Sequence, residues 1–117
     1  MTAERPFPRQ GEIWETDFEP TFGHEQRGTR PALVLSVDGV NAARWVSIVL
    51  PMSRQIKDIP TRIHVDASET GLDGDSDILC DQIRAVDHGR LLHRRSTVSP
   101  ATLRRCTALV ERMIKVP

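Results

Sequence analysis

A loop at residues 23–31 places several side chains that could act on a phosphate. It carries one carboxylate and two guanidinium groups, from Glu25, Arg27 and Arg30, and leads directly into an apolar run at 32–36. A guanidinium group presents a fork of donors that matches phosphate oxygens, and a carboxylate can take or relay a proton. Functional side chains often sit on loops held by rigid strands. The loop is therefore either a phosphate-handling site or an ordinary solvated loop with an internal Glu–Arg pair.

Short strands are expected to position this loop. Alternating polar and apolar residues predict a half-buried strand at 12–18, and a β-branched run predicts a central strand at 32–37. Turn residues at Asp38-Gly39 and polar loops separate these strands from the rest. Further strands are expected at 45–50, where Pro51 closes the strand, at 61–66, and at 78–80 with 83–86, the last being one strand broken near Asp81 and Gln82.

The last predicted element is an amphipathic helix. Ser99 is a suitable N-cap and Pro100 suits the first helical position. Apolar residues then recur at spacings of three and four, at Leu103, Cys106, Leu109, Val110 and Met113. The stripe should pack on the sheet. Many short strands with one terminal helix predict an α+β, mainly β fold built on a small, strongly curved antiparallel sheet.

Composition narrows the function classes. The 117 residues predict one domain at 10–117 after a flexible lead-in at 1–9. Net charge is zero, so any nucleic-acid site must concentrate its basic residues in one groove. No apolar run approaches a bilayer span and no signal core is visible, which predicts a cytoplasmic protein. Cys80, placed in an apolar strand, and Cys106 are read as buried hydrophobes without a disulfide.

Metal and cofactor chemistry is not expected. The four histidines lack HxxxH or HxH spacing, and His64 should face solvent because it alternates with apolar neighbours. The acidic run at 66–77 lacks the ligand order of an EF-hand and reads as a solvated turn. There is no phosphate-binding glycine motif and no nucleophile elbow.

The sequence resembles the MazF/PemK/Kid family of toxin endoribonucleases from toxin–antitoxin systems. The matching blocks follow the family's order and extend from about residue 10 to the C-terminal helix. They are Gly11-Glu12-Ile13-Trp14 with Asp17 and Pro20, Gly23-His24-Glu25-Gln26, Thr29-Arg30-Pro31-Ala32-Leu33-Val34-Leu35-Ser36, Leu50-Pro51-Met52-Ser53 and Asp81-Gln82-Ile83-Arg84.

The resemblance implies roles for individual residues. Arg30 matches the family's catalytic arginine, Ser53 falls where the family carries a catalytic Ser or Thr, and Glu25 matches a glutamate implicated in activity. Ser53 could instead be a hydroxyl that caps the backbone, Gln82 a turn amide, and Arg84 a solvent-facing residue. The residues expected to contact RNA are Gln26, Arg27, Thr29, Arg54, Lys57, Gln82 and Arg84.

The implied activity is sequence-selective, metal-independent cleavage of single-stranded RNA. The ribose 2′-hydroxyl attacks the adjacent phosphate, which leaves a 2′,3′-cyclic phosphate and a 5′-hydroxyl. The resemblance also implies an SH3-like barrel of the PemK/CcdB type, a homodimer, and inhibition by a cognate MazE-like antitoxin. Two alternatives remain: a CcdB-like toxin that binds DNA gyrase, although the chain lacks that group's Trp-Gly-Ile tail, and an inactive relative that binds RNA or antitoxin.

Overall fold

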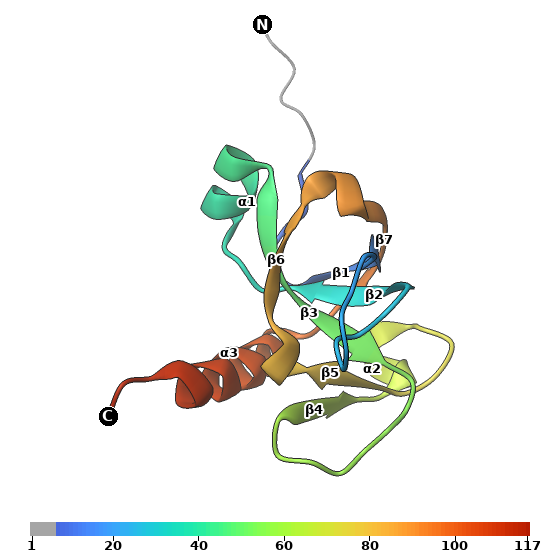
Figure 1. Cartoon of the computed structure of the whole chain (residues 1–117). Helices are drawn as coiled ribbons and strands as arrows, with labels where there is room; N and C mark the ends of the chain where they lie inside the picture. The colour runs from blue at the N-terminus through green and yellow to red at the C-terminus, as the bar shows by residue number, and fades with distance from the viewer. Residues whose placement is uncertain (1–6) are drawn as a thin grey trace, which may run out of the picture.

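The computed structural model describes residues 7–117, as a strongly curved antiparallel sheet with a C-terminal helix (Figure 1). The part of the predicted lead-in at 1–6 lies outside the described residues. The strands are β1 (Glu12–Asp17), β2 (Thr29–Val34), β3 (Val46–Ser53), β4 (Arg62–Val65), β5 (Ser76–Leu79), β6 (Arg84–Asp87) and β7 (Leu91–Thr97). The helices are α1 (Asp38–Arg44), α2 (Ala67–Thr70) and α3 (Pro100–Ile114), with short 3₁₀ helices η1 (Cys80–Gln82) and η2 (His88–Arg90).

Strand β3 connects the two halves of the sheet. The seven strands pair in the order β4-β5-β3-β2-β1-β7, and β6 also pairs with β3. The first part of β3 pairs with β6 and its end pairs with β5, so β3 changes partner along one edge. The described ladders do not join β4 to β7, so the predicted barrel-like curvature is confirmed but the barrel is not closed.

The third strand is longer than the sequence predicted. Pro51 was expected to end it, yet β3 continues through Pro51 to Ser53. A proline lacks an N–H and is normally excluded from central strands. Here the pairing with β6 ends at Val49 and the pairing with β5 begins at Met52, so Pro51 lies at the gap between the two ladders. The extension carries Ser53 into the sheet.

The two faces of the sheet bury separate apolar clusters. Leu33 of β2 and Leu50 of β3 face a cluster that includes Cys106 of α3. Their neighbours Ala32 and Val34 face the opposite cluster, which is built around Phe18. Because successive strand side chains alternate between faces, a continuous apolar run such as β2 is buried on both sides. The strand that carries Arg30 is therefore buried on both faces over its second half.

Helix α3 forms as predicted. The Ser99 hydroxyl accepts a hydrogen bond from the N–H of Thr102 at 3.2 Å, and Pro100 occupies the first turn. Both cysteines are buried free thiols, but Cys80 lies in η1 rather than in a strand. The hydrogen bond between the two thiols, with burial, raises the pKa of Cys106. In residues 7–117, no helix combines the length and apolar character needed to cross a membrane.

Helix α1 replaces a predicted turn at Asp38-Gly39. Its buried Asn41 accepts hydrogen bonds from the hydroxyls of Ser36 at 2.5 Å and Ser47 at 2.7 Å. The Asn41 amide also donates to the Ser36 carbonyl at 3.0 Å. Burying an amide is unfavourable unless its polar atoms are paired. These partners allow the short helix to dock on β3, an arrangement that local sequence propensity does not reveal.

Strand β7 is another element that the sequence analysis missed. The expectation of a solvated turn at 66–77 was also wrong in part, because 67–70 form α2 and Ser76 and Asp77 are buried in β5. Its residues are mostly exposed, so the alternation that marks a half-buried strand is weak. Its pairing with β1 also shifts register twice, between Ile13 and Trp14 and between Glu15 and Thr16. Two ion pairs cross this ladder, Arg94 with Glu12 and Arg95 with Glu15, both at 2.8 Å. The basic residues of β7 are thus engaged with β1.

Candidate active site

The loop at 19–28 begins and ends at the paired strands β1 and β2. The N–H of Phe18 donates to the carbonyl of Gly28 at 3.0 Å, and the N–H of Gly28 donates to the Glu19 carboxylate at 3.0 Å. Gly28 adopts a φ of 75°, which glycine tolerates without strain. Arg90 donates to the carbonyls of Asp17 and Glu19. The base of the loop is therefore fixed on the sheet.

A tight turn forms the tip of this loop. The N–H of Glu25 donates to the carbonyl of Phe22 at 3.1 Å, and the Phe22 N–H donates back to the Glu25 carboxylate at 2.8 Å. Gly23 supplies the positive φ of 57° that this turn requires. The carboxylate of Glu25 is thus oriented by the backbone of its own turn.

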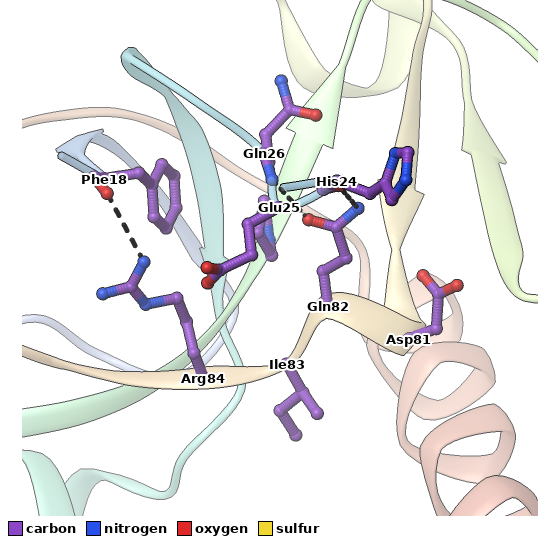
Figure 2. Close-up of a pocket in the computed structure, with 9 residues that line it drawn as sticks. Phe18, His24, Glu25, Gln26, Asp81, Gln82, Ile83 and Arg84 are labelled. Atoms are coloured by element: carbon purple, nitrogen blue, oxygen red, sulfur yellow. Dashed lines mark hydrogen bonds between the residues drawn. The ribbon is translucent and has the colours of Figure 1, made fainter. Parts of the chain in front are cut away.

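Gln82 bonds the same loop to the segment between β5 and β6. Its side-chain oxygen accepts from the N–H of Gln26 at 2.6 Å, and its amide nitrogen donates to the His24 carbonyl at 3.5 Å (Figure 2). Gln82 lies in η1, which interrupts the strand between β5 and β6. The predicted break near Asp81-Gln82 is confirmed, and it turns Gln82 toward the loop.

Three arginines and a serine line one cavity of about 370 Å³ beside this loop. Its lining residues are Glu25, Gln26, Arg27, Arg30, Ser53, Arg54 and Gln55. Three arginines and one glutamate line it, so its lining residues carry a formal charge of +2 in a chain whose net charge is zero. Such local concentration of charge attracts anions even in a neutral protein.

Arg30 and Ser53 reach this cavity from neighbouring strands. Arg30 is half-buried, and its Nε donates to the Arg27 carbonyl at 2.8 Å, which orients the guanidinium group. Its terminal nitrogens have no hydrogen bond to any of residues 7–117 and remain available for an anion. The Ser53 side chain, 7% exposed, accepts from the Gln55 N–H at 3.1 Å and keeps its own proton to donate. The Ser53 hydroxyl therefore caps the backbone, as the alternative prediction held, and its O–H remains able to donate a hydrogen bond.

A second cavity of about 440 Å³ adjoins the first, since Glu25 and Gln26 line both. Its other lining residues are Phe18, His24, Pro51, Asp81, Gln82, Ile83 and Arg84. Figure 2 shows the Glu25 carboxylate extending toward the side formed by Phe18 and Arg84. The Arg84 guanidinium donates to the Phe18 carbonyl at 3.5 Å and lies 5.5 Å from the centre of the Phe18 ring. The two cavities therefore lie side by side, with Glu25 and Gln26 between them.

The profile of the "PemK-like, MazF-like toxin of type II toxin-antitoxin system" family matches residues 9–114. The chain belongs to this family. The family inferred from the sequence motifs is therefore confirmed.

Individual members of the PemK/MazF family agree with this assignment. Endoribonuclease MazF9 of Mycobacterium tuberculosis (strain ATCC 25618 / H37Rv) is 38% identical over 101 residues, which cover 81% of this chain and 86% of that protein. The structure of MazF from Deinococcus radiodurans matches with a TM-score of 0.85 and 26% identity, covering 96% and 100% of the two chains. A MazE–MazF structure from Deinococcus radiodurans matches with a TM-score of 0.78 and 21% identity, covering 97% and 100%, and supports the fold alone.

Most sequence-predicted residues of this PemK/MazF-family chain line one of the two cavities. Thr29 and Lys57 line neither. Thr29 is exposed at the start of β2, opposite Asp17, and the Lys57 N–H donates to the buried Asp77 carboxylate at 2.8 Å. Asp77 also pairs with Arg62 at 3.2 Å, so this contact anchors the 54–60 loop.

The sequence analysis did not assign a role to several cavity residues, namely Phe18, His24, Pro51, Gln55, Asp81 and Ile83. Asp81 and Ile83 flank Gln82 within a motif that was noticed, so the strand break could have marked them. Phe18 is buried beneath Arg84 and carries no polar signal. Its presence follows from the tertiary fold.

One group of residues in the described 7–117 range could hold a metal ion. The ligand atoms of His64, Asp66 and Asp75 lie within 4.8 Å of one another, and all three residues are exposed. The hydrogen bond from His64 to Asp66, at 3.0 Å, raises the pKa of His64. None of the three lines either cavity, and His64 faces solvent as predicted.

Proposed function

We propose that this protein is a toxin endoribonuclease that cleaves single-stranded RNA without a metal ion. The carrying observation is that Arg30 and Ser53 line one polar cavity with two further arginines. The ribose 2′-hydroxyl attacks the adjacent phosphorus, and the 5′-oxygen of the next nucleotide leaves. The products are a 2′,3′-cyclic phosphate and a 5′-hydroxyl.

Arg30 is proposed to stabilise the charge on the phosphorane oxygens. Its Nε is held by the Arg27 carbonyl, so its terminal nitrogens are oriented before the substrate arrives. Preorganised donors of this kind stabilise the transition state because they need no rearrangement during the reaction. Ser53 donates its remaining proton to a phosphate oxygen from the cavity wall.

Glu25 is proposed to move the proton. It lines both cavities, so its carboxylate lies beside the phosphate cavity and the next subsite at once. One carboxylate oxygen, Oε1, accepts from the Phe22 N–H, which leaves Oε2 without a hydrogen bond to the described residues. A positioned carboxylate can accept the 2′-hydroxyl proton and pass one to the leaving oxygen.

The RNA strand is proposed to pass through both cavities. Arg27 and Arg54 add to the positive charge around the scissile phosphate, and Gln26, Gln82 and Arg84 line the adjoining cavity. Thr29 and Lys57 would meet only RNA that extends beyond these cavities. Activity on messenger RNA would place the protein in the cytoplasm.

Two protein partners complete the proposal. An antitoxin with an acidic, apolar tail would occupy the arginine cavity, since carboxylates can sit where phosphates lie. Antitoxin and RNA would then compete. The homodimer partner would cover an apolar groove of about 370 Å³ around α1 and β3. Val37, Val40 and Ile48 line this groove and are 54%, 38% and 38% exposed.

Incubation of the purified protein with a long RNA in EDTA tests the activity. Sequencing of the new 5′ ends should give discrete cleavage sites with 5′-hydroxyl termini. An RNA with a 2′-deoxy or 2′-O-methyl group at the scissile nucleotide should resist cleavage. Rapid cleavage of that modified RNA, or a strict requirement for added metal, would overturn the proposal. The gyrase-directed alternative predicts no RNA cleavage in this assay.

A further inference from the structure

Phe22 is the most exposed aromatic side chain in the described residues. It is 78% exposed, whereas Phe18 is fully buried and Phe7, Trp14 and Trp45 are at least partly covered. Single exposed apolar residues are common on protein surfaces, so exposure alone assigns no role. The role proposed for Phe22 therefore depends on its place in the loop.

Phe22 is tied directly to the candidate active site. It is the first residue of the turn that ends at Glu25, and two hydrogen bonds, of 2.8 and 3.1 Å, join the two residues. The ends of such a turn lie within about 7 Å of each other. Glu25 lines both cavities. The exposed Phe22 therefore belongs to the same turn as a residue that lines both cavities, although Phe22 itself lines neither.

The turn that carries Phe22 is also held in place. The Gln26 N–H, next to the turn, bonds to Gln82 at 2.6 Å, and the loop base is closed between Phe18 and Gly28 at 3.0 Å. A ring on an anchored turn loses little further conformational freedom when a ligand binds. This distinguishes Phe22 from an apolar residue on an unanchored surface segment.

We propose that Phe22 is a base-stacking residue, which receives a nucleobase next to the phosphate bound among Arg27, Arg30 and Arg54. The inference rests on the proposed RNA-cleaving function. The arginine cavity supplies charge for the backbone, but a single strand also needs an apolar surface for its unstacked bases. Every base has a π-face, so stacking adds affinity with little dependence on base identity.

The expected effects separate stacking from simple apolar contact. Replacing a stacking aromatic residue by alanine typically weakens single-strand binding by about 5- to 150-fold. Phe22→Ala and Phe22→Leu should both raise KM by this amount, because leucine keeps an apolar side chain but lacks the π-face. Phe22→Trp should keep the affinity. None should change the cleavage sequence or the melting temperature, since the ring is exposed.

The test uses RNA oligonucleotides that contain 2-aminopurine at successive positions and a 2′-deoxy nucleotide at the scissile site. With the wild-type protein, fluorescence should fall strongly at one position beside that site. The change should be lost in Phe22→Leu and retained in Phe22→Trp. Leu92→Ala is the matched control, because Leu92 is an apolar residue that is 54% exposed and lies on β7 rather than on the turn that ends at Glu25.

Three other results would contradict either the stacking role of Phe22 or the proposed RNA cleavage. If Phe22→Leu keeps the fluorescence change and the wild-type KM, stacking is excluded. If Phe22→Ala weakens only the binding of an acidic antitoxin peptide, the ring belongs to a protein interface and the inference fails. If the wild type binds RNA with a Phe22-dependent signal but does not cleave it in EDTA, the proposed activity fails and the stacking assignment stands.

Discussion

The side-chain oxygen of Gln82 accepts a 2.6 Å hydrogen bond from the N–H of Gln26, across 56 positions of sequence. The same side chain donates to the His24 carbonyl at 3.5 Å. Both the oxygen and the nitrogen of the Gln82 side-chain amide therefore bond to the loop that carries Glu25. This makes it a positioning residue for the loop, whether or not it also meets RNA.

Loss of this link should loosen the loop before any RNA is present. Gln82→Leu removes the acceptor, whereas Gln82→Glu keeps an oxygen for the Gln26 N–H. Misplacement of catalytic groups by about 1 Å can cost on the order of 100-fold, so Gln82→Leu should lower kcat by about 10- to 100-fold. Amide hydrogen exchange at Gln26 should accelerate in the RNA-free Leu variant and not in the Glu variant. Unchanged exchange in both variants would show that Gln82 does not hold the loop.

Arg30→Ala should abolish most of the activity without unfolding the protein. Removal of one preorganised donor to a developing anion typically costs about 100- to 1000-fold in rate. Arg30→Lys should recover little of this, because an ammonium group lacks the planar fork. Single-turnover cleavage rates and melting temperatures measure both effects.

Val34→Ala provides the contrast for Arg30. Val34 is fully buried in the Phe18 cluster, so truncation should leave a cavity and cost about 1 to 3 kcal/mol of stability. Its melting temperature should fall while the cleavage rate at low temperature is kept. If Arg30→Ala melted as early as Val34→Ala, or cleaved RNA at the wild-type rate, Arg30 would not be the catalytic centre.

Ser53→Ala should have a smaller effect than Arg30→Ala. It removes one hydrogen bond from a neutral hydroxyl to the charged phosphate, worth about 1.5 to 3 kcal/mol, and so should slow cleavage by about 10- to 150-fold. It also removes the acceptor for the Gln55 N–H. Ser53→Thr keeps the hydroxyl and should restore the rate. A fall as large as that of Arg30→Ala would assign Ser53 a proton-transfer role instead.

Gly74 makes room for one of the cavity arginines. A Cβ at position 74 would lie 2.8 Å from the Arg54 Cζ, so Gly74→Ala must displace that side chain. Each phosphate contact contributes about 0.7 to the slope of log binding constant against log salt for single strands. Arg54→Ala and Gly74→Ala should both reduce this slope, although only the first removes a charge. An unchanged slope in Gly74→Ala would mean that Arg54 binds RNA equally well from another position.

The pH dependence of stability should contain a contribution from His64. Asp66, Asp75 and the buried Asp77 all face this ring, and they raise its pKa above the ordinary value. Stabilisation is therefore full below the unfolded-state pKa and is lost as the pH rises through the folded-state pKa. Melting temperatures between pH 5.5 and 8.5 should fall with pH more in the wild type than in His64→Gln. If melting temperature fell equally with pH in both proteins, His64 would not contribute to the pH dependence of stability.

The sequence predicted those elements in which the spacing of apolar residues matches the buried face. β1, β2 and α3 were identified because alternation, continuous apolar character and a capped amphipathic stripe are visible within each segment. α1 was missed because its Asn41 docks through buried side-chain hydrogen bonds to Ser36 and Ser47, which leave no periodic pattern. β7 was missed because its partner strand lies far along the chain, as the pairing of Arg94 with Glu12 shows. Tertiary contacts override local propensity in both elements.

For the candidate site, too, some features could be predicted from the sequence and others could not. The motifs pointed to Glu25, Arg30 and Ser53, and all three line the arginine cavity. The motifs also singled out Gln82, but its bond to Gln26 depends on how η1 turns toward the loop. Phe22 belongs to no motif, and the role proposed for it follows only from its exposure and its hydrogen bonds to Glu25. The residue types could be predicted, but the contacts that orient them could not.

The pairing of β1 with β7 has a consequence for synthesis on the ribosome. Glu12 lies opposite Thr97, and the N–H of Val98 donates to the carbonyl of Gly11 at 2.9 Å. One hydrogen-bonding edge of β1 therefore stays open until almost the whole chain has emerged. The loop at 19–28 starts from that same strand. A chain shortened before residue 91 therefore lacks the partner of one edge of the strand from which this loop departs.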